Sequence, residues 1–198
     1  LLAVGGTLTT ERLLLAYSKG IFPWEFWGEP PLWHWHSPNP RFLLVPDEFR
    51  ISRSLKTVIK KDIFEVRIDT AFLDVMNACS RMPRKNQAGT WIAPEMIASY
   101  GKLHEEGYAH SFESFRGDKL VGGLYGISLG RAFFGESMFY LEPEASKVAL
   151  AQLVTFAKAN TFHFIDCQMP TNHLAHLGAR EIPRPDFLDM LGQSLEDS

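Results

Sequence analysis

The stretch YAHSFESFRGDKLVGGLYGISLGRAFF, residues 108–134, decides the fold class. Aromatic, β-branched and other apolar residues fill three runs, over residues 108–115, 119–127 and 131–134. Glycines separate these runs, which predicts three strands. Gly117 and Asp118 fit the tight turn of a β-hairpin between the first two. The stretch therefore predicts a sheet that contains at least one antiparallel pair.

The segments on either side alternate between helical and extended patterns. Helices are expected at residues 9–20, 51–61, 71–80, 94–106, 144–160, 172–177 and 185–193, and further strands at 41–45, 64–68 and 162–168. Residues 22–40 hold five prolines and four of the five tryptophans, which predicts a stiff, shaped loop rather than regular structure throughout. The expected fold is α+β, with a small N-terminal domain at 1–44 and a mixed sheet flanked by helices at 45–198.

Composition limits the classes of protein to consider. Of 198 residues, 45% are hydrophobic and 22% are charged, which is typical of a soluble globular protein. The net charge of −3 is unlike that of a chain that binds nucleic acid over its whole surface. No apolar run is long enough to cross a bilayer, and the first residues lack the pattern of a signal peptide. We therefore expect a cytoplasmic protein that does not bind membranes.

Cysteine and histidine give no indication of a metal site. Cys79 and Cys167 lack the spacing of metal ligands, so a reduced cytoplasmic protein is the simplest interpretation. The seven histidines show no known ligand pattern. His34 and His36, two residues apart, have the spacing of a ligand pair but fit surface residues better.

A basic helix is the first candidate functional element. Residues 50–61 carry five positive charges and no acid, and Arg53, Lys56 and Lys60 share one helical face, followed by Lys61. On an otherwise acidic chain this face fits contact with a phosphate backbone. Taken alone, the pattern favours a solvated helix face over a contact with phosphate.

A lone carboxylate is the second candidate. Glu136 follows the apolar pair Phe133 and Phe134, so partial burial is expected to perturb its pKa. The alternative is a structural glutamate paired with an arginine.

A strand with polar groups at its end is the third candidate. Side chains alternate along a strand, so Asp166 and Gln168 share a face with Phe162 and Phe164. Two polar groups at the end of an aromatic face are able to hold an amine and a carbonyl. The alternative is a strand end that emerges into solvent.

These motifs together resemble the leucyl/phenylalanyl-tRNA–protein transferase family. The matching stretches follow the family order and span nearly the whole chain: 17–24 (YSKGIFPW), 37–41 (SPNPR), 89–92 (GTWI), 103–111 (LHEEGYAHS), 120–126 (LVGGLYG), 135–139 (GESMF), 145–147 (ASK), 165–168 (IDCQ) and 177–183 (LGAREIP).

The resemblance implies a fold, an activity and partners. The larger domain is expected to resemble the GCN5-related acetyltransferases. The enzyme is expected to transfer leucine or phenylalanine, with methionine a further donor, from aminoacyl-tRNA to proteins that begin with Lys or Arg, which marks them for degradation. It is expected to act as a monomer in the cytoplasm and to use no metal, acyl-CoA or other cofactor.

The reaction is aminolysis of an activated ester, in which catalysis is chiefly positioning. We assign Asp166 and Gln168 to the attacking amine, with the Gln168 side-chain amide oriented by a hydrogen bond to the Asp166 carboxylate. Glu136 is expected to hold the donor ammonium or the terminal ribose, or to assist proton transfer. The sequence leaves these three roles open.

The resemblance also implies a donor site. Trp24 and Trp91 are expected to bracket the terminal adenosine or the donor side chain, and Leu124, Phe133 and Met138 are candidates for the apolar pocket. The chain departs from the family in residues 33–38 (WHWHSP), which contain extra residues in the usual Trp-Trp-Ser-Pro run. It also has Ala157 where an aromatic residue is expected.

Two other functions are compatible with parts of the pattern. An acyl-CoA N-acetyltransferase has the same expected fold, but the glycine-rich pyrophosphate loop of that class is missing from the sequence. The second is a noncatalytic module that binds RNA or basic N-termini.

Overall fold

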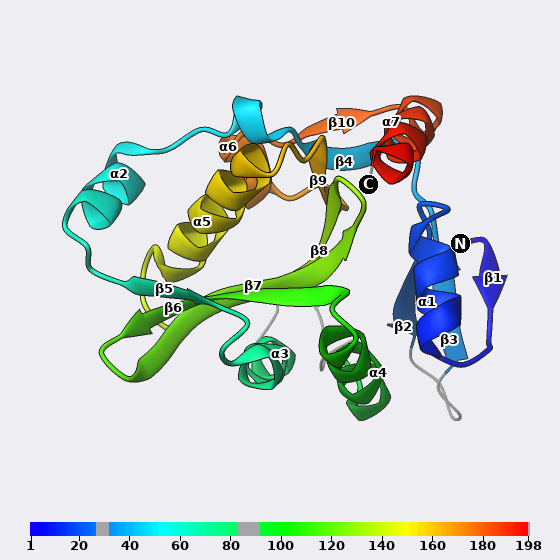
Figure 1. Ribbon diagram of the computed structural model, residues 1–198, viewed down its shortest axis with the longest axis horizontal. Coiled ribbons are helices and arrows are strands. Elements are labelled where there is room, and N and C mark those ends of the chain that lie inside the picture. The colour runs from blue at the N-terminus through cyan, green and yellow to red at the C-terminus, as the bar shows by residue number, and fades with distance from the viewer. Residues whose placement is uncertain (27–31, 83–91, 198) are drawn as a thin grey trace.

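The computed structural model describes residues 1–26, 32–82 and 92–197, which form two sheets and the helices around them (Figure 1). The elements are β1 (Ala3–Val4), α1 (Thr10–Tyr17), β2 (Phe22–Phe26), β3 (Leu32–His36), β4 (Arg41–Leu44), a 3₁₀ turn (Pro46–Glu48), α2 (Arg53–Lys60), β5 (Glu65–Ile68), α3 (Phe72–Arg81), α4 (Pro94–Glu105), β6 (Ala109–Arg116), β7 (Lys119–Leu129), β8 (Ala132–Tyr140), α5 (Ala145–Ala159), β9 (Phe164–Gln168), α6 (Asn172–His176), β10 (Arg180–Ile182) and α7 (Arg184–Glu196).

The small N-terminal unit contains α1 and an antiparallel sheet in the order β1-β3-β2. The expectation of a loop over residues 22–40 is therefore wrong for β2 and β3. In the described part of this segment, Pro23 is the proline that lies within a strand, and β2 is an edge strand, where a missing N–H group is tolerated. Trp33 and Trp35 alternate with half-buried histidines and are themselves buried, which is the pattern of a strand with one face in the core.

The large sheet has the order β10-β4-β9-β8-β7-β6-β5. All neighbours are antiparallel except β8 and β9, which are parallel. The predicted hairpin is confirmed, because Arg116 pairs with Lys119 across the Gly117-Asp118 turn. Strand β8 is longer than the predicted run at 131–134 and includes Glu136.

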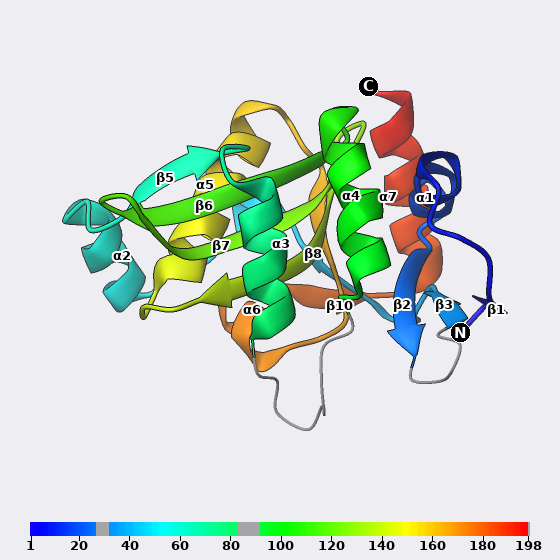
Figure 2. The same ribbon diagram turned by 90° about the horizontal axis from the view of Figure 1, so that it is seen from below.

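Helices cover both faces of this sheet (Figures 1 and 2). Helix α5 packs on one face, over β6 and β7, while α3 and α4 lie on the other. A Cβ atom at Gly122 would lie 2.6 Å from the Cβ of Ala145, so glycine is what allows α5 to begin so close to β7. The fold class is confirmed as α+β, with a small N-terminal unit and a mixed sheet flanked by helices.

The helices α1 and α7 are neighbours beside the large sheet in both views (Figures 1 and 2). Gly20, just after α1, lies against the ring of Phe187 from α7. Strand β4 ends at residue 44, where the N-terminal domain is expected to end, yet it belongs to the large sheet. The division into two domains stays a prediction. Among the described helices, none combines the length and the apolarity needed to cross a membrane.

Candidate active site

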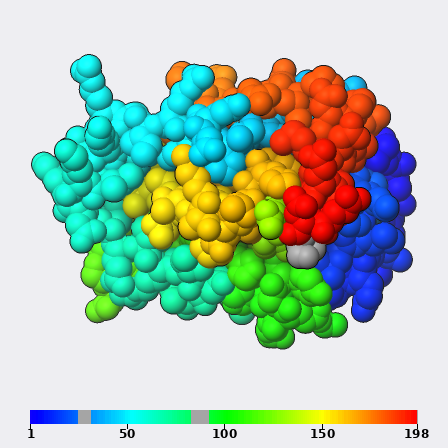
Figure 3. All heavy atoms as spheres, turned by 45° about the horizontal axis from the view of Figure 1, so that its top comes forward, coloured from blue at the N-terminus to red at the C-terminus, as the bar shows by residue number. Residues whose placement is uncertain are grey.

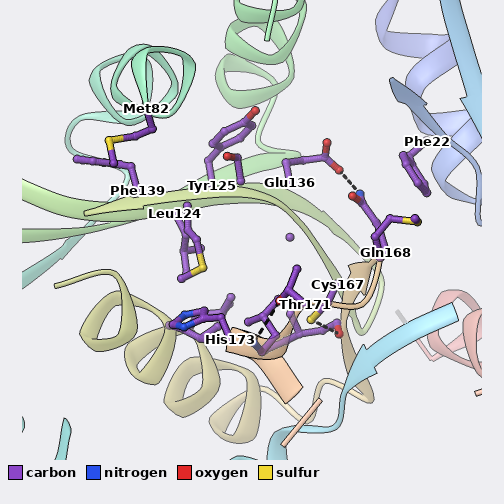
Figure 4. Close-up of a pocket in the computed structure, with 18 of the residues that line it drawn as sticks. Phe22, Met82, Leu124, Tyr125, Glu136, Phe139, Cys167, Gln168, Thr171 and His173 are labelled. Atoms are coloured by element: carbon purple, nitrogen blue, oxygen red, sulfur yellow. Dashed lines mark hydrogen bonds between the residues drawn. The ribbon is translucent and has the colours of Figure 1, made fainter. Parts of the chain in front are cut away.

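A cavity opens where the parallel strands β8 and β9 separate. The two strands pair only from Ala132 to Phe134 and from Phe164 to Asp166, and β8 then continues to Tyr140. The cavity that follows has a volume of about 490 Å³. Its apolar wall comes from the sheet and from α5 and α6, and it includes Leu124, Met138, Leu150, Leu153, Ile165 and Leu174. Leu124 and His173 lie on opposite sides of it (Figure 4).

Glu136 and Gln168 form a polar pair at one side of this cavity, beside Phe22 (Figure 4). The Gln168 side-chain Nε2 donates a 2.6 Å hydrogen bond to Glu136 Oε1, and both residues are only 8% exposed. An ionised carboxylate accepts hydrogen bonds and donates none, so this contact fixes which end of the Gln168 amide faces Glu136. The carbonyl oxygen of Gln168 is thereby available to a hydrogen-bond donor in the cavity.

Two buried tyrosines donate hydrogen bonds to the carboxylate of Glu136. The Tyr17 hydroxyl, from α1, donates to Glu136 Oε1 at 2.7 Å, and the Tyr100 hydroxyl, from α4, donates to Oε2 at 3.4 Å. The two hydroxyls also contact each other at 2.5 Å. Burial raises the pKa of Glu136 to about 7, and burial raises the pKa of both phenols well above 10. Glu136 therefore titrates near neutral pH, while the phenols remain hydrogen-bond donors.

Asp166 lies behind the site rather than in the cavity wall. Its carboxylate is fully buried and forms a salt bridge with Arg41, with Nη2 and Oδ2 2.5 Å apart. Its Oδ1 accepts the backbone N–H of Gln168 at 2.9 Å, where Gln168 has a left-handed backbone with φ of 62°. We expected the Asp166 carboxylate to accept the Gln168 side-chain amide. That prediction is wrong, because the side-chain amide of Gln168 donates to Glu136 instead.

Arg41 connects this aspartate to the rest of the protein. Its Nη1 donates to the carbonyl of Gly20 at 3.0 Å, and its guanidinium lies 5.0 Å and 4.5 Å from the ring centroids of Phe22 and Phe187. The arginine thus contacts the N-terminal unit, α7 and β9 at once.

The structure brings most of the predicted donor-site residues together. Trp24, Leu124 and Met138 line the cavity with Glu136. Phe133 is buried in the apolar cluster that contains Leu124. Trp91 lies outside the described residues.

Sequence reasoning missed Tyr17, Tyr100 and Arg41. Tyr17 and Arg41 fall inside the family-like stretches 17–24 and 37–41, which is the signal that was available for them. For Tyr100 the sequence offered only its place on an expected helix.

The basic residues of α2 lie away from the cavity. Arg53, Lys56, Lys60 and Lys61 are all exposed, and none of the salt bridges among the described residues involves them. Helix α2 projects at one end of the molecule and the N-terminal unit lies at the other (Figure 3). Leu55 is buried and anchors α2 to the rest of the protein, whereas Ile51 and Ile59 are exposed.

Glu136→Gln is expected to stabilise the fold at pH 8 by about 2–3 kcal/mol and to have little effect at pH 4. The pKa of Glu136 is raised from 4.5 to about 7 in the folded state, so protonation favours the fold below pH 4.5. That contribution is lost as the pH rises through 7. Glutamine removes the charge and keeps an oxygen that accepts from Tyr17. Urea unfolding at pH 4 and pH 8 measures the difference.

The exposed Glu105→Gln is the matched control, and it should show no such pH dependence. A Glu136→Gln effect that is equal at both pH values would contradict a buried, titrating Glu136.

Two family models match this chain. The model described as "Leucyl/phenylalanyl-tRNA protein transferase" matches residues 43–192, and the one described as its N-terminal domain matches residues 6–39.

Curated proteins with the name "Leucyl/phenylalanyl-tRNA--protein transferase" are similar over almost the whole chain. The protein from Desulfatibacillum aliphaticivorans is 57% identical over 196 residues, 99% of this chain and 83% of its own length. The one from Legionella pneumophila (strain Paris) is 56% identical, over 99% of this chain and 86% of its own length. The one from Myxococcus xanthus is 52% identical over 98% and 82%.

Proposed function

The chain belongs to the leucyl/phenylalanyl-tRNA–protein transferase family, and we propose that the cavity beside Glu136 and Gln168 is where its reaction occurs. It is an aminoacyltransferase that moves an aminoacyl group from tRNA to the N-terminus of a protein. The donor is an ester that already carries the energy for the new peptide bond, so the enzyme has chiefly to bring an amine and a carbonyl together.

The apolar part of the cavity is the proposed site of the donor side chain. Its walls of leucine, methionine and isoleucine suit leucine, phenylalanine and methionine, which bury apolar area without needing a hydrogen-bond partner. Trp24 lies at the edge of the same cavity and is proposed to stack with the terminal adenosine, together with Trp91. Such stacking contributes about 1–3 kcal/mol per base.

The polar pair is the proposed site of the attacking amine. The amide of Gln168 donates to Glu136, so its carbonyl oxygen is the acceptor that an N–H of the amine can use. An α-amino group has a pKa of about 7.7–8.0, so a useful fraction is neutral at pH 7 and needs orientation more than deprotonation. Glu136 fixes the Gln168 amide, and its charge attracts the cationic amine before it reacts.

Asp166 is proposed to position Gln168 without contacting either substrate. It holds the Gln168 backbone, as described above, and its charge is neutralised by Arg41. We propose acceptors that begin with Lys or Arg, which the transfer marks for degradation. A cytoplasmic monomer is proposed because aminoacyl-tRNA is a cytoplasmic substrate and the described residues that line the cavity, with Glu136 and Gln168 among them, come from one chain.

The hydrogen-bonded pair of Glu136 and Gln168 at one side of an apolar cavity is the observation that carries this function. Transfer of labelled leucine from charged tRNA to a peptide beginning with Arg tests it. Acetyl-CoA in place of charged tRNA is the control for an N-acetyltransferase. Binding of both substrates without transfer would indicate the noncatalytic alternative.

The donor site is expected to prefer leucine over aspartate by at least 100-fold in kcat/KM. An unpaired carboxylate in the apolar wall formed by Leu124, Met138 and Leu153 loses its hydration without gaining a partner. Among apolar donors discrimination is graded, because one methylene contributes only about 1–3 kcal/mol. Transfer assays with the separately charged tRNAs measure these ratios, and equal rates for leucine and aspartate would exclude this cavity as the donor site.

Removing the charges of α2 is expected to weaken binding of the tRNA body. The triple change of Arg53, Lys60 and Lys61 to Ala should raise KM for charged tRNA several-fold and reduce its dependence on salt, because fewer phosphate contacts release fewer counterions. A leucyl-adenosine donor lacks the distant phosphates, so its KM should not change. Steady-state kinetics at two salt concentrations measure both effects.

Changing the exposed Lys102 and Lys119 to Ala is the control for lost positive charge elsewhere on the surface, and because it removes two charges rather than three, the changes in KM are compared per charge removed. If the α2 variant and the control raise KM equally per charge, the effect belongs to net charge and α2 has no special role. Equal losses with both donors would indicate that α2 acts on the fold or the chemistry.

A further inference from the structure

A row of aromatic rings continues from the cavity across the N-terminal sheet. We define this ring ladder as Phe22 and Trp24 from β2 with His34 and His36 from β3. Phe22 pairs directly with His36, and Trp24 pairs with His34, so the four side chains share one face of the sheet. Phe22 and Trp24 also line the cavity. The ladder is therefore continuous with the proposed reaction site.

The rings of the ladder are arranged side by side. Phe22 and His36 have near-parallel planes with centroids 6.1 Å apart, and His36 and His34 repeat this arrangement at 6.3 Å. Trp24 meets His36 edge-on at 5.9 Å. Trp33 and Trp35, the neighbours of the two histidines on the other face of β3, are buried, whereas His34 and His36 are half-buried. The polar rings thus lie on the more accessible face.

We propose that His34 and His36 form a stacking site for the unpaired nucleotides that precede the terminal adenosine of the donor tRNA. The inference rests on the proposed function, because it continues the path of the donor beyond the cavity. The donor ester sits on a single-stranded 3′ end, and single-stranded bases are bound by stacking on Phe, Tyr, Trp or His. With the terminal adenosine at Trp24, the next bases reach the histidine half of the ladder.

The protonation state of His36 agrees with stacking rather than with pairing to phosphate. Burial is the main cause that lowers the pKa of His36, so its ring is neutral at physiological pH. A neutral imidazole offers a π face and a hydrogen-bonding edge, but it has no charge to pair with the phosphate backbone of the tRNA. The contribution of the ladder to affinity should therefore depend little on salt, unlike that of α2.

Donors of different length test the proposal. Leucine esterified to adenosine ends at Trp24, whereas leucine esterified to the trinucleotide CCA extends along the ladder. In the double variant His34→Ala and His36→Ala, the kcat/KM ratio of the trinucleotide donor to the adenosine donor should fall about tenfold, as expected for one lost stacking partner. The double variant with Phe at both positions keeps the stacking faces and should restore the ratio.

His176→Ala, which removes an exposed imidazole of α6, is the control and should leave the ratio unchanged. The proposal is overturned if the double Ala variant loses equally with both donors, as misfolding would cause, or if its ratio is unchanged. It is also overturned if the double Phe variant fails to restore the ratio. A wild-type ratio that falls on adding EDTA would indicate a metal bound by the two histidines and overturns the proposal too. If the wild-type protein transfers leucine from neither donor nor from charged tRNA, the proposed function itself fails.

Discussion

Replacing Arg41 with methionine is expected to lower the free energy of unfolding by about 3–5 kcal/mol. Arg41 and Asp166 are both fully buried and are joined by a salt bridge, so removal of the cation leaves a buried charge without its partner. The guanidinium also contacts the carbonyl of Gly20 and two aromatic rings. Methionine fills much of the volume but replaces none of these polar contacts. Urea unfolding at pH 7 measures the loss.

The double variant Arg41→Met with Asp166→Leu is the control. It removes both charges at once, and well-packed apolar residues often replace a buried ion pair at little cost. It should therefore be more stable than the single variant, although Gln168 loses the acceptor for its backbone N–H. A double variant that is less stable than Arg41→Met would contradict an unpaired charge as the cause.

The change Gln168→Met is expected to lower kcat by about 10²-fold, the loss that misplacing a reacting group by about 1 Å can cause. The side chain keeps its length and its apolar stem but loses the carbonyl oxygen proposed to orient the amine. Glu136 loses the 2.6 Å hydrogen bond from the amide at the same time. The cavity wall for the donor side chain is unaffected, so KM for charged tRNA should change little. Single-turnover rates at saturating donor separate the two constants.

Gln193→Met on α7 makes the same chemical change at an exposed position and should retain full activity. Asp166→Asn offers a second comparison, because it keeps the shape and weakens only the hold on Arg41 and the Gln168 backbone. We expect a smaller loss of kcat for it than for Gln168→Met. A Gln168→Met enzyme with normal kcat would remove the amide from the reaction.

Local patterns were enough to predict most of the large sheet. The hairpin of β6 and β7 follows from the Gly117-Asp118 turn between two apolar runs, and α5 follows from its amphipathic length. Strands β2 and β3 were missed because the segment that holds them, residues 22–40, contains five prolines. Their strand character depends on pairing with each other and on burial of Trp33 and Trp35, which are tertiary effects.

The candidate site was predictable in its residues but not in its contacts. Glu136, Asp166 and Gln168 stand out because polar groups follow apolar strands. The alternation rule placed Asp166 and Gln168 on one face, and from this we expected a contact between their side chains. The left-handed backbone at Gln168 and the buried Arg41 from β4 decide otherwise, and neither is visible to a period-two pattern.

The position of β4 also has a consequence for synthesis of the chain. Arg41 belongs to a strand that is made well before its hydrogen-bonded neighbours in the sheet, β9 and β10, and its partner Asp166 lies 125 residues further on. Contacts between such distant segments form late in folding, since a large loop must first close. A nascent or truncated chain that ends before β9 lacks Gln168 and leaves Arg41 without its aspartate. The proposed active site therefore exists only after β9 has been made, so a nascent chain that is still shorter than this lacks the residue proposed to orient the amine.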